Sequence, residues 1–398
     1  MYNSNFVNKN KTKLVLQNEY AHKDELKMRK ILLVLLGVII SQISFSQAET
    51  KHSKVKTLFH FVTVGDSREE PALVKLSAQE QLWIQNTKVL TRMVREIQAA
   101  KPQALFFNGD MIYGYSTDPK IMNTQYAYWR GATSHLMETG TYIVPVPGNH
   151  EVQIKAKDEN GKPIKKAVVE SEVLWRENMG DLIINPTRWE EVTKTKISAW
   201  DIKNTPAIGT DGITTDQSQL SYSFDVDQSH FAIFNTDPTG FDDSAPVAWL
   251  AEDFARAKSR GAKNFFVFSH KMAFTYNTEK QKSLNKIKAG GFDIRKEVRD
   301  TFWDIIEQYQ AISFTGHQHT YHASQPRKAE GGRAWQVIVG SGGSNYAISK
   351  EMMDKPSDRM FSWADVKVKS NGKTEIKIFG FDEPFKKTQL IESWIVSN

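Results

Sequence analysis

Five short polar fragments, each placed directly after an apolar run, carry the residues of this chain best suited to chemistry. Their side chains include carboxylates, an amide and imidazoles, and the chain contains no cysteine. Oxygen and nitrogen ligands without thiolates suit two divalent or trivalent cations that share a bridging carboxylate. The pattern therefore predicts a two-metal site of the kind that hydrolyses phosphate esters. In chain order the fragments are Gly65-Asp66-Ser67-Arg68, Gly109-Asp110-Met111-Ile112-Tyr113, Gly148-Asn149-His150-Glu151, His270 and Gly316-His317-Gln318-His319.

The apolar runs before these fragments predict the strands that position them. Each run is short and rich in Val, Ile and Phe, which is typical of a buried strand. Ligands at the ends of neighbouring strands converge where an α/β sheet usually places its site. Helical spacing between the runs predicts helices that alternate with the strands in a layered α/β domain. The predicted strands are Phe59–Val64, Ala104–Phe107, Tyr142–Val146, Phe265–Phe268 and Ala311–Phe314, and the predicted helices lie at 90–97, 125–137, 247–258 and 294–309.

Two regions depart from this alternation. Between residues 152 and 219 the periodicity weakens, and a long insertion directly after Gly-Asn-His-Glu is expected to form a rim or lid of the site. Basic residues cluster at 155–166 within it, a pattern most often found in a solvated loop. From Trp335 to Phe379 apolar and polar residues alternate, which predicts antiparallel strands.

In these fragments the chain resembles the calcineurin-like metallophosphoesterase superfamily, and within it the purple acid phosphatase branch. The superfamily pattern is an Asp at a strand end, Gly-Asp, Gly-Asn-His-Asp/Glu, a lone His and Gly-His-x-His, and all five occur here in that order. Tyr113, three residues after Asp110, and Tyr321, two after His319, resemble the purple branch. The resemblance spans residues 57–380 or so and implies an α/β fold, a four-layer αββα sandwich of two mixed β-sheets flanked by helices.

The resemblance also implies a role for each site residue. Asp110 is expected to bridge the metals, because one oxygen ligand of a two-metal site must reach both ions. His150, beside a ligand in the chain, is expected to contact phosphate and to stabilise charge or transfer a proton. The alternative for an Asp after Gly is a turn or helix cap. The other expected ligands are Asp66 and His319 at the first metal, and Asn149, His270 and His317 at the second.

The first fragment departs from the common superfamily pattern Asp-x-His, because Arg68 stands in the place of the His. Tyr113 is the expected substitute ligand. A phenolate favours a trivalent ion, so a purple-type site would hold Fe³⁺ together with Fe²⁺, Zn²⁺ or Mn²⁺. A site that is not purple-type would hold Mn²⁺, Zn²⁺ or Fe²⁺. The alternative for Tyr113 is an aromatic side chain packed near the site. Arg68 either binds substrate phosphate or neutralises Asp66 or Glu69.

The N-terminal residues predict export. Three basic residues between 27 and 30 precede the apolar core Ile31–Ile40, and Ser46-Gln47-Ala48 follows as a cleavage pattern, as in a secretory signal peptide. Because 27 residues precede Met28, Met28 is the expected true start. The alternative is an uncleaved anchor, although the core is short for a membrane span. We expect an N-terminal extension and signal peptide at 1–48, and a metallophosphoesterase domain at 55–398 with an insertion at about 152–219.

Seven of the 52 basic residues and three of the 46 acidic residues lie within residues 1–48, so the mature chain is close to neutral. This balance gives no electrostatic argument for nucleic-acid binding. The predicted function is a secreted or periplasmic phosphomonoesterase that uses a metal-activated water on small phosphate esters. No nucleic acid and no stable membrane association are expected once the signal is cleaved, and the sequence leaves the oligomeric state open. The alternatives are a phosphodiesterase of the same superfamily and an inactive secreted binding protein on this fold.

Overall fold

The computed structural model describes residues 27–29, 55–71 and 80–397. The chain divides between Val55 and Lys56 into two units, and the second unit carries the predicted site. The predicted signal-peptide core at 31–40 and the cleavage pattern at 46–48 lie outside the described residues. Within the described ranges, no helix is both long and apolar enough to span a membrane.

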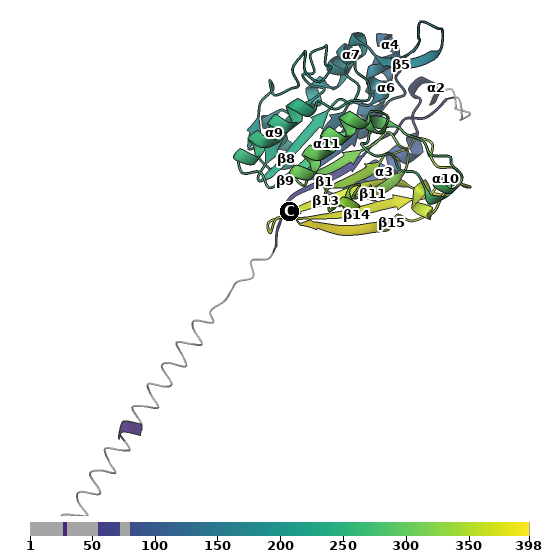
Figure 1. Cartoon of the computed structure of the whole chain (residues 1–398). Coiled ribbons are helices and arrows are strands. Elements are labelled where there is room, and N and C mark those ends of the chain that lie inside the picture. Colours follow the sequence, from purple (N-terminus) through teal and green to yellow (C-terminus); the bar gives the residue numbers. More distant parts are fainter. Residues whose placement is uncertain (1–26, 30–54, 72–79, 398) are drawn as a thin grey trace, which may run out of the picture. The chain divides into compact units, whose positions relative to one another are not determined.

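The first sheet has six strands, and three parallel strands in it lead to three of the predicted fragments (Figure 1). In order across the sheet they are β15 (Gln389–Ser397), β14 (Lys373–Phe381), β13 (Phe361–Lys369), β1 (Thr57–Val64), β2 (Ala104–Asn108) and β3 (Tyr142–Val146). β1, β2 and β3 pair in parallel, so their carboxyl ends share one edge. β13, β14 and β15 form an antiparallel meander that joins β1 through β13.

The second sheet has seven strands, and its central strands lead to the other two fragments. In order they are β11 (Tyr321–Ser324), β12 (Trp335–Val339), β10 (Ile312–Thr315), β9 (Asn264–Ser269), β8 (Ser229–Phe234), β7 (Tyr222–Val226) and β6 (Ala199–Trp200). β8, β9, β10 and β12 run parallel to one another. β11 at one edge, and β7 and β6 at the other, are antiparallel to their neighbours.

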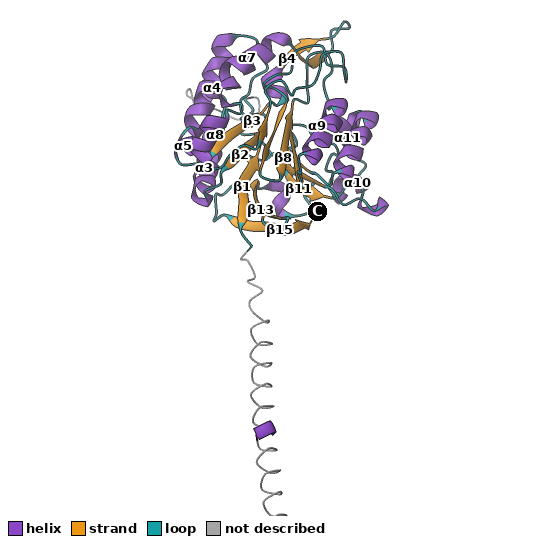
Figure 2. Cartoon of the chain, turned by 90° about the vertical axis from the view of Figure 1, so that its left-hand side faces the viewer, coloured by secondary structure: helices purple, strands orange, loops and turns teal. Residues whose placement is uncertain are grey.

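Helices cover the outer faces of both sheets. Figure 2 shows α3 (Thr87–Ala100) and α4 (Pro119–Thr133) on one side of the strands, with α9 (Val247–Ser259) and α11 (Lys296–Gln308) on the other. Separate apolar clusters join the first pair to the first sheet and the second pair to the second sheet. The predicted four-layer αββα sandwich is therefore confirmed. The remaining helices of the domain are α2 (Glu80–Trp83), α5 (His135–Glu138), α6 (Asn149–Val152), α7 (Val169–Met179), α8 (Pro186–Thr193) and α10 (Glu279–Ser283).

Aromatic rings fill the inner core between the two sheets. Phe61 of β1 is fully buried, and its ring centroid lies 5.3 Å from that of Phe106, 5.2 Å from that of Phe266 and 5.9 Å from that of Phe314. These edge-to-face contacts add to the burial of the rings themselves. The strands that lead to the site therefore stand on a closely packed base.

A buried ion cluster ties α9 to the second sheet. The His230 ring lies between two carboxylates, with Nδ1 2.6 Å from Asp225 Oδ1 and Nε2 2.9 Å from Asp253 Oδ2. Burial by itself lowers the pKa of His230, but the hydrogen bonds to Asp225 and Asp253 outweigh it and raise the pKa. Arg260 completes the cluster through Nε, 2.7 Å from Asp225 Oδ2.

Most predicted elements occur within a few residues of their predicted bounds, and two points need correction. The helix predicted at 125–137 begins earlier, at Pro119 after the cap Asp118, and is interrupted at Ser134 between α4 and α5. The antiparallel pairing predicted after Trp335 is incomplete, because β12 also pairs in parallel with β10. Four of the five residues of β12, Gln336 included, are buried, as expected of a strand covered on both faces. The insertion at 152–219 contains α7, α8 and a hairpin of β4 (Gln153–Lys157) and β5 (Pro163–Ala167).

Candidate metal centre

The predicted fragments lie where five strand ends from both sheets meet. β1, β2 and β3 end just before the first three fragments, and β9 and β10 end just before the last two. Backbone hydrogen bonds link successive turns: Asp66 N donates to Gly109 O at 2.9 Å, and Gly316 N donates to His270 O at 2.9 Å. The turns are therefore held as one unit at the common edge of the sandwich, as the strand-end pattern predicted.

Asp66, Asp110 and His319 form the first group of donors. One side-chain donor atom from each lies within 4.8 Å of the others. His319 Nδ1 donates to the Asn345 carbonyl at 2.6 Å, which leaves the lone pair of Nε2 at 3.3 Å from Asp66 Oδ1. Among the described residues, Asp66 Oδ1 accepts no hydrogen bond. Buried acceptors that face each other in this way favour a cation between them.

Asn149, His270 and His317 form the second group. Asn149 Oδ1 lies 3.0 Å from both His270 Nε2 and His317 Nδ1, and these two ring nitrogens are 3.1 Å apart. His270 Nδ1 donates to the Asn108 carbonyl at 2.8 Å, so in the neutral ring the Nε2 lone pair faces the other donors. The lone pairs that face one another in this group outnumber the protons shared among them, so the group suits a second cation.

Asp110 belongs to both groups, as expected of a bridging ligand. Its Oδ1 lies 3.2 Å from His270 Nε2. Burial by itself raises the pKa of Asp110, but His150, His270 and Arg68 outweigh it and hold the pKa well below its usual range. Burial by itself lowers the pKa of His270, and Asp110 raises it to about 9. A cation at the second group would therefore have to displace the proton of His270.

The backbone is strained at three of the expected ligands. Asp66, Asp110 and His317 have φ values of 63°, 51° and 66°, in the left-handed region that residues with a Cβ rarely adopt. Such conformations cost about 1–3 kcal/mol each and cluster at functional sites. Gly148 permits the close approach of its turn to the neighbouring one, since a Cβ there would lie 2.4 Å from Asp110 N.

Glu151 holds the turn that carries Asp110, a role that the sequence analysis missed. Its fully buried carboxylate accepts from the backbone nitrogens of Asp110 at 2.9 Å, Met111 at 2.8 Å, Ile112 at 3.1 Å and Gly148 at 2.7 Å. The signal was present in the sequence, because a Glu three residues after a helix cap is the capping-box spacing. Glu151, the last residue of Gly-Asn-His-Glu, therefore orients the expected ligands and is not itself an expected ligand.

The two tyrosines of the second fragment take different positions. The Tyr113 hydroxyl accepts a hydrogen bond from Lys155 Nζ at 2.6 Å. The Tyr115 hydroxyl instead accepts from Asn149 Nδ2 at 2.5 Å, and its ring centroid is 3.9 Å from that of His150. The structure therefore brings Tyr115, which the sequence analysis did not select, into contact with an expected ligand. Ligation by Tyr113 stays a prediction.

His150 and Arg68 both face Asp110. His150 Nδ1 donates to the Tyr113 carbonyl, and its Nε2 lies 3.6 Å from Asp110 Oδ2. Arg68 Nε lies 3.4 Å from the same oxygen, and its NH1 lies 3.5 Å from Glu70 Oε2. Arg68 therefore pairs with Asp110 and Glu70, whereas the sequence analysis named Asp66 or Glu69 as the carboxylates it would neutralise.

This arrangement coincides with a match to a known family. Residues 60–321, which contain every expected site residue, match the family model described as calcineurin-like phosphoesterase. The chain belongs to the calcineurin-like phosphoesterase family. Members of this family hold a dimetal centre, and the two donor groups that share Asp110 fit one.

A solved structure shares the fold of this calcineurin-like phosphoesterase. The purple acid phosphatase PPD1 from yellow lupin (Lupinus luteus) seeds is 13% identical with a TM-score of 0.52, over 87% of this chain and 54% of that one. This chain thus spans about half the length of the lupin structure. A dimetal phosphatase from Danio rerio is 9% identical (TM-score 0.42; 86% and 99% covered), and GAP50, the anchor in the inner membrane complex of Plasmodium, is 11% identical (TM-score 0.41; 86% and 89% covered). No curated protein sequence matches the chain.

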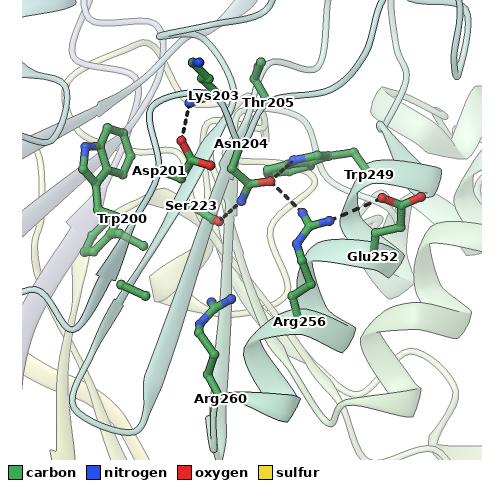
Figure 3. A pocket seen from close by; sticks show the side chains of 12 residues that line it. Trp200, Asp201, Lys203, Asn204, Thr205, Ser223, Trp249, Glu252, Arg256 and Arg260 are labelled. Carbon is green, nitrogen blue, oxygen red and sulfur yellow. Dashed lines mark hydrogen bonds and ion pairs between the residues drawn. The ribbon is translucent and has the colours of Figure 1, made fainter.

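A separate hollow of about 520 Å³ lies between the β6 edge of the second sheet and α9 (Figure 3). Asn204 occupies its centre: Nδ2 donates to Ser223 Oγ at 2.8 Å, and Oδ1 accepts from Trp249 Nε1 at 3.1 Å and from Arg256 NH2 at 2.7 Å. The polar groups around Asn204 in this hollow therefore form hydrogen bonds with one another. None of the expected metal ligands of this phosphoesterase lines the hollow.

Proposed function

We propose that the protein is an exported two-metal phosphatase that hydrolyses small phosphate monoesters. The observation that carries the proposal is the pair of donor groups that share Asp110, which supply oxygen and nitrogen ligands to two neighbouring cation positions. Export rests on the signal-peptide pattern before residue 49. The match to the phosphoesterase family supports the reaction class, and the monoester preference and the location are part of the proposal.

Bound metal ions would clamp the phosphoryl oxygens and acidify a water molecule that attacks phosphorus. The chain supplies the surrounding groups. Asp110 and Asp66 contribute the negative charge that holds the cations, and Glu151 fixes the Asp110 turn. His150 keeps a proton at Nδ1 through the Tyr113 carbonyl, so Nε2 is the atom at which it can take up a proton or contact phosphate. The Arg68 guanidinium adds positive charge beside Asp110.

A panel of ester substrates tests the proposal. Metal-loaded protein is expected to release 4-nitrophenol from 4-nitrophenyl phosphate at least about tenfold faster than from bis(4-nitrophenyl) phosphate, and a chelator should abolish both activities. A preference for the diester would instead identify a phosphodiesterase. Metal-loaded protein that hydrolyses neither ester would overturn the proposal and favour a binding protein on this fold.

A further inference from the structure

The β4–β5 hairpin brings two lysines to the rim of the metal centre. β4 begins directly after α6, the short helix that carries Asn149 and His150, so the hairpin is continuous with the site (Figure 1). Lys155 of β4 lies directly opposite Lys165 of β5 in the register of the hairpin. Side chains paired in this way share one face of a ribbon. The two ammonium groups therefore project together.

Both ammonium groups lie over the tyrosines of the site. Lys165 Nζ is 4.5 Å from the ring centroid of Tyr115, and Lys155 Nζ is 5.3 Å from the same centroid and 4.9 Å from that of Tyr113. The Tyr115 hydroxyl in turn contacts the amide of Asn149. A single tyrosine ring thus separates the lysine pair from an expected metal ligand. The basic cluster at 155–166, which the sequence suggested to be a solvated loop, lies partly against the site.

Neither lysine of this pair has a carboxylate of the described residues in direct contact with its ammonium group. Within the described ranges, neither Lys155 nor Lys165 forms an ion pair, whereas Lys271, close by, contacts both Asp237 and Asp243. Like charges directly opposite each other destabilise a hairpin. Burial lowers the pKa of Lys165, and although Asp110 opposes this effect, the nearby Arg68, Lys155 and Lys271 act with burial. An arrangement that costs folding energy and faces the site indicates that an anion completes it.

The base of the hairpin is anchored, so the two lysines have a defined position. Gln153 Nε2 donates to Asp242 Oδ1 at 3.0 Å, and the backbone nitrogen of Ala167, opposite it, donates to the same oxygen at 3.0 Å. Gln153 Nε2 also donates to Asp237 Oδ1 at 3.1 Å. Both strands are therefore fixed to the loop that follows β8, and only the tip of the hairpin extends away from the domain.

We propose that Lys155 and Lys165 bind a second phosphoryl group of the substrate, so that the preferred substrates carry another phosphate besides the one hydrolysed. This inference rests on the proposed phosphatase function. Lysine binds phosphate as a point charge with three donors and needs no fixed plane of approach. Two adjacent ammonium groups match the double charge of a terminal phosphoryl group. A monoester whose alcohol is uncharged would leave this site empty.

The binding of two stable phosphonates tests the inference without turnover. Calorimetry with metal-loaded protein compares methylphosphonate, which has one phosphonyl group, with methylenediphosphonate, which has two. The Lys155→Gln, Lys165→Gln double variant should lose about 100-fold in affinity for the diphosphonate, about tenfold per lysine, and little for methylphosphonate. Each single variant, Lys155→Gln and Lys165→Gln, is compared with Lys166→Gln, which also removes one charge but lies on the opposite face, paired with Ile154. An unchanged ratio of the two affinities in the double variant would overturn the inference.

A second measurement separates this inference from the proposed function. The kcat/KM values of the wild-type protein are compared for glucose 6-phosphate and glucose 1,6-bisphosphate. The inference requires a preference for the bisphosphate that the double variant loses and Lys166→Gln keeps. Hydrolysis of both sugars without preference would contradict the inference and leave the phosphatase function intact. Hydrolysis of neither would contradict the phosphatase function, and the phosphonate affinities would still decide whether the lysines bind a second phosphoryl group.

Discussion

Replacing Gly148 by alanine tests whether the metal centre depends on direct contact between two of its turns. An added Cβ would lie 2.4 Å from Asp110 N, 2.5 Å from Asp110 Oδ1 and 2.7 Å from Glu151 Oε2, whereas ordinary contacts begin at 3.4 Å. The Asp110 carboxylate must therefore move by about 1 Å. Its backbone cannot follow freely, because Glu151 Oε2 holds Asp110 N at 2.9 Å. A displacement of about 1 Å in a catalytic constellation costs about 100-fold in rate.

The same contact gives a stability cost. Overpacking costs about 1–3 kcal/mol, and loss of one hydrogen bond to the buried Glu151 carboxylate adds about 1.5–3 kcal/mol. We expect Gly148→Ala to lower the free energy of unfolding by about 3 kcal/mol or more. Urea unfolding, metal content and release of 4-nitrophenol measure the three consequences.

Gly131→Ala is the matched control, because a Cβ at this position in α4 meets nothing within 4 Å. Replacing Gly by Ala inside a helix stabilises it by about 0.5–1 kcal/mol. The control should therefore bind metal and turn over like the wild type. A Gly148→Ala protein with full metal content and wild-type activity would show that the Asp110 turn can move without consequence, contrary to this prediction.

Three further predictions follow from the site, the fold and the N-terminus. Iron-loaded protein should be coloured, and Tyr113→Phe should lose the visible band while Tyr115→Phe keeps it; a colourless protein would make Tyr113 a wall residue. His230→Asn should have a lower free energy of unfolding than the wild type, and this difference should be fully present below the unfolded-state pKa of about 6.5. It should shrink as the pH rises through the raised pKa of His230 in the folded state. Urea unfolding at low and high pH measures the difference, and a difference that grows with pH would contradict the prediction. Intact mass of protein from native cells should place the mature N-terminus at or near Glu49, whereas a mass that retains Ile31–Ile40 would indicate an anchor.

The strand ends could be predicted from the sequence because local and global signals agree there. The apolar run Phe59–Val64 is long enough to define a buried strand, and the polar residue after it must then lie at the sheet edge. The same reasoning located Asp110 and His270. The ligands were predictable because their types and order restrict the chemistry, and the structure brings six of them into two adjoining groups.

The contacts that cross the chain could not be predicted in this way. Tyr115 reaches Asn149 only because the turn after β2 folds over α6, and no spacing in the sequence reports that approach. Lys155 and Lys165 are ten residues apart in a segment without clear periodicity, so their common face became visible only through the hairpin register. β12 pairs in parallel because it joins the second sheet beside β10. The alternation of apolar and polar side chains does not specify which sheet a strand joins.

Metal stoichiometry tests most directly whether Asp110 bridges two cations held by the two donor groups. Protein loaded with iron, zinc or manganese and freed of excess metal should contain about two ions per chain by elemental analysis. Asp110→Asn should fall well below two, because the amide removes the charge shared by both ions, while Asp118→Asn, at the exposed cap of α4, should keep both. Two ions in Asp110→Asn, or none in the wild type, would contradict the account.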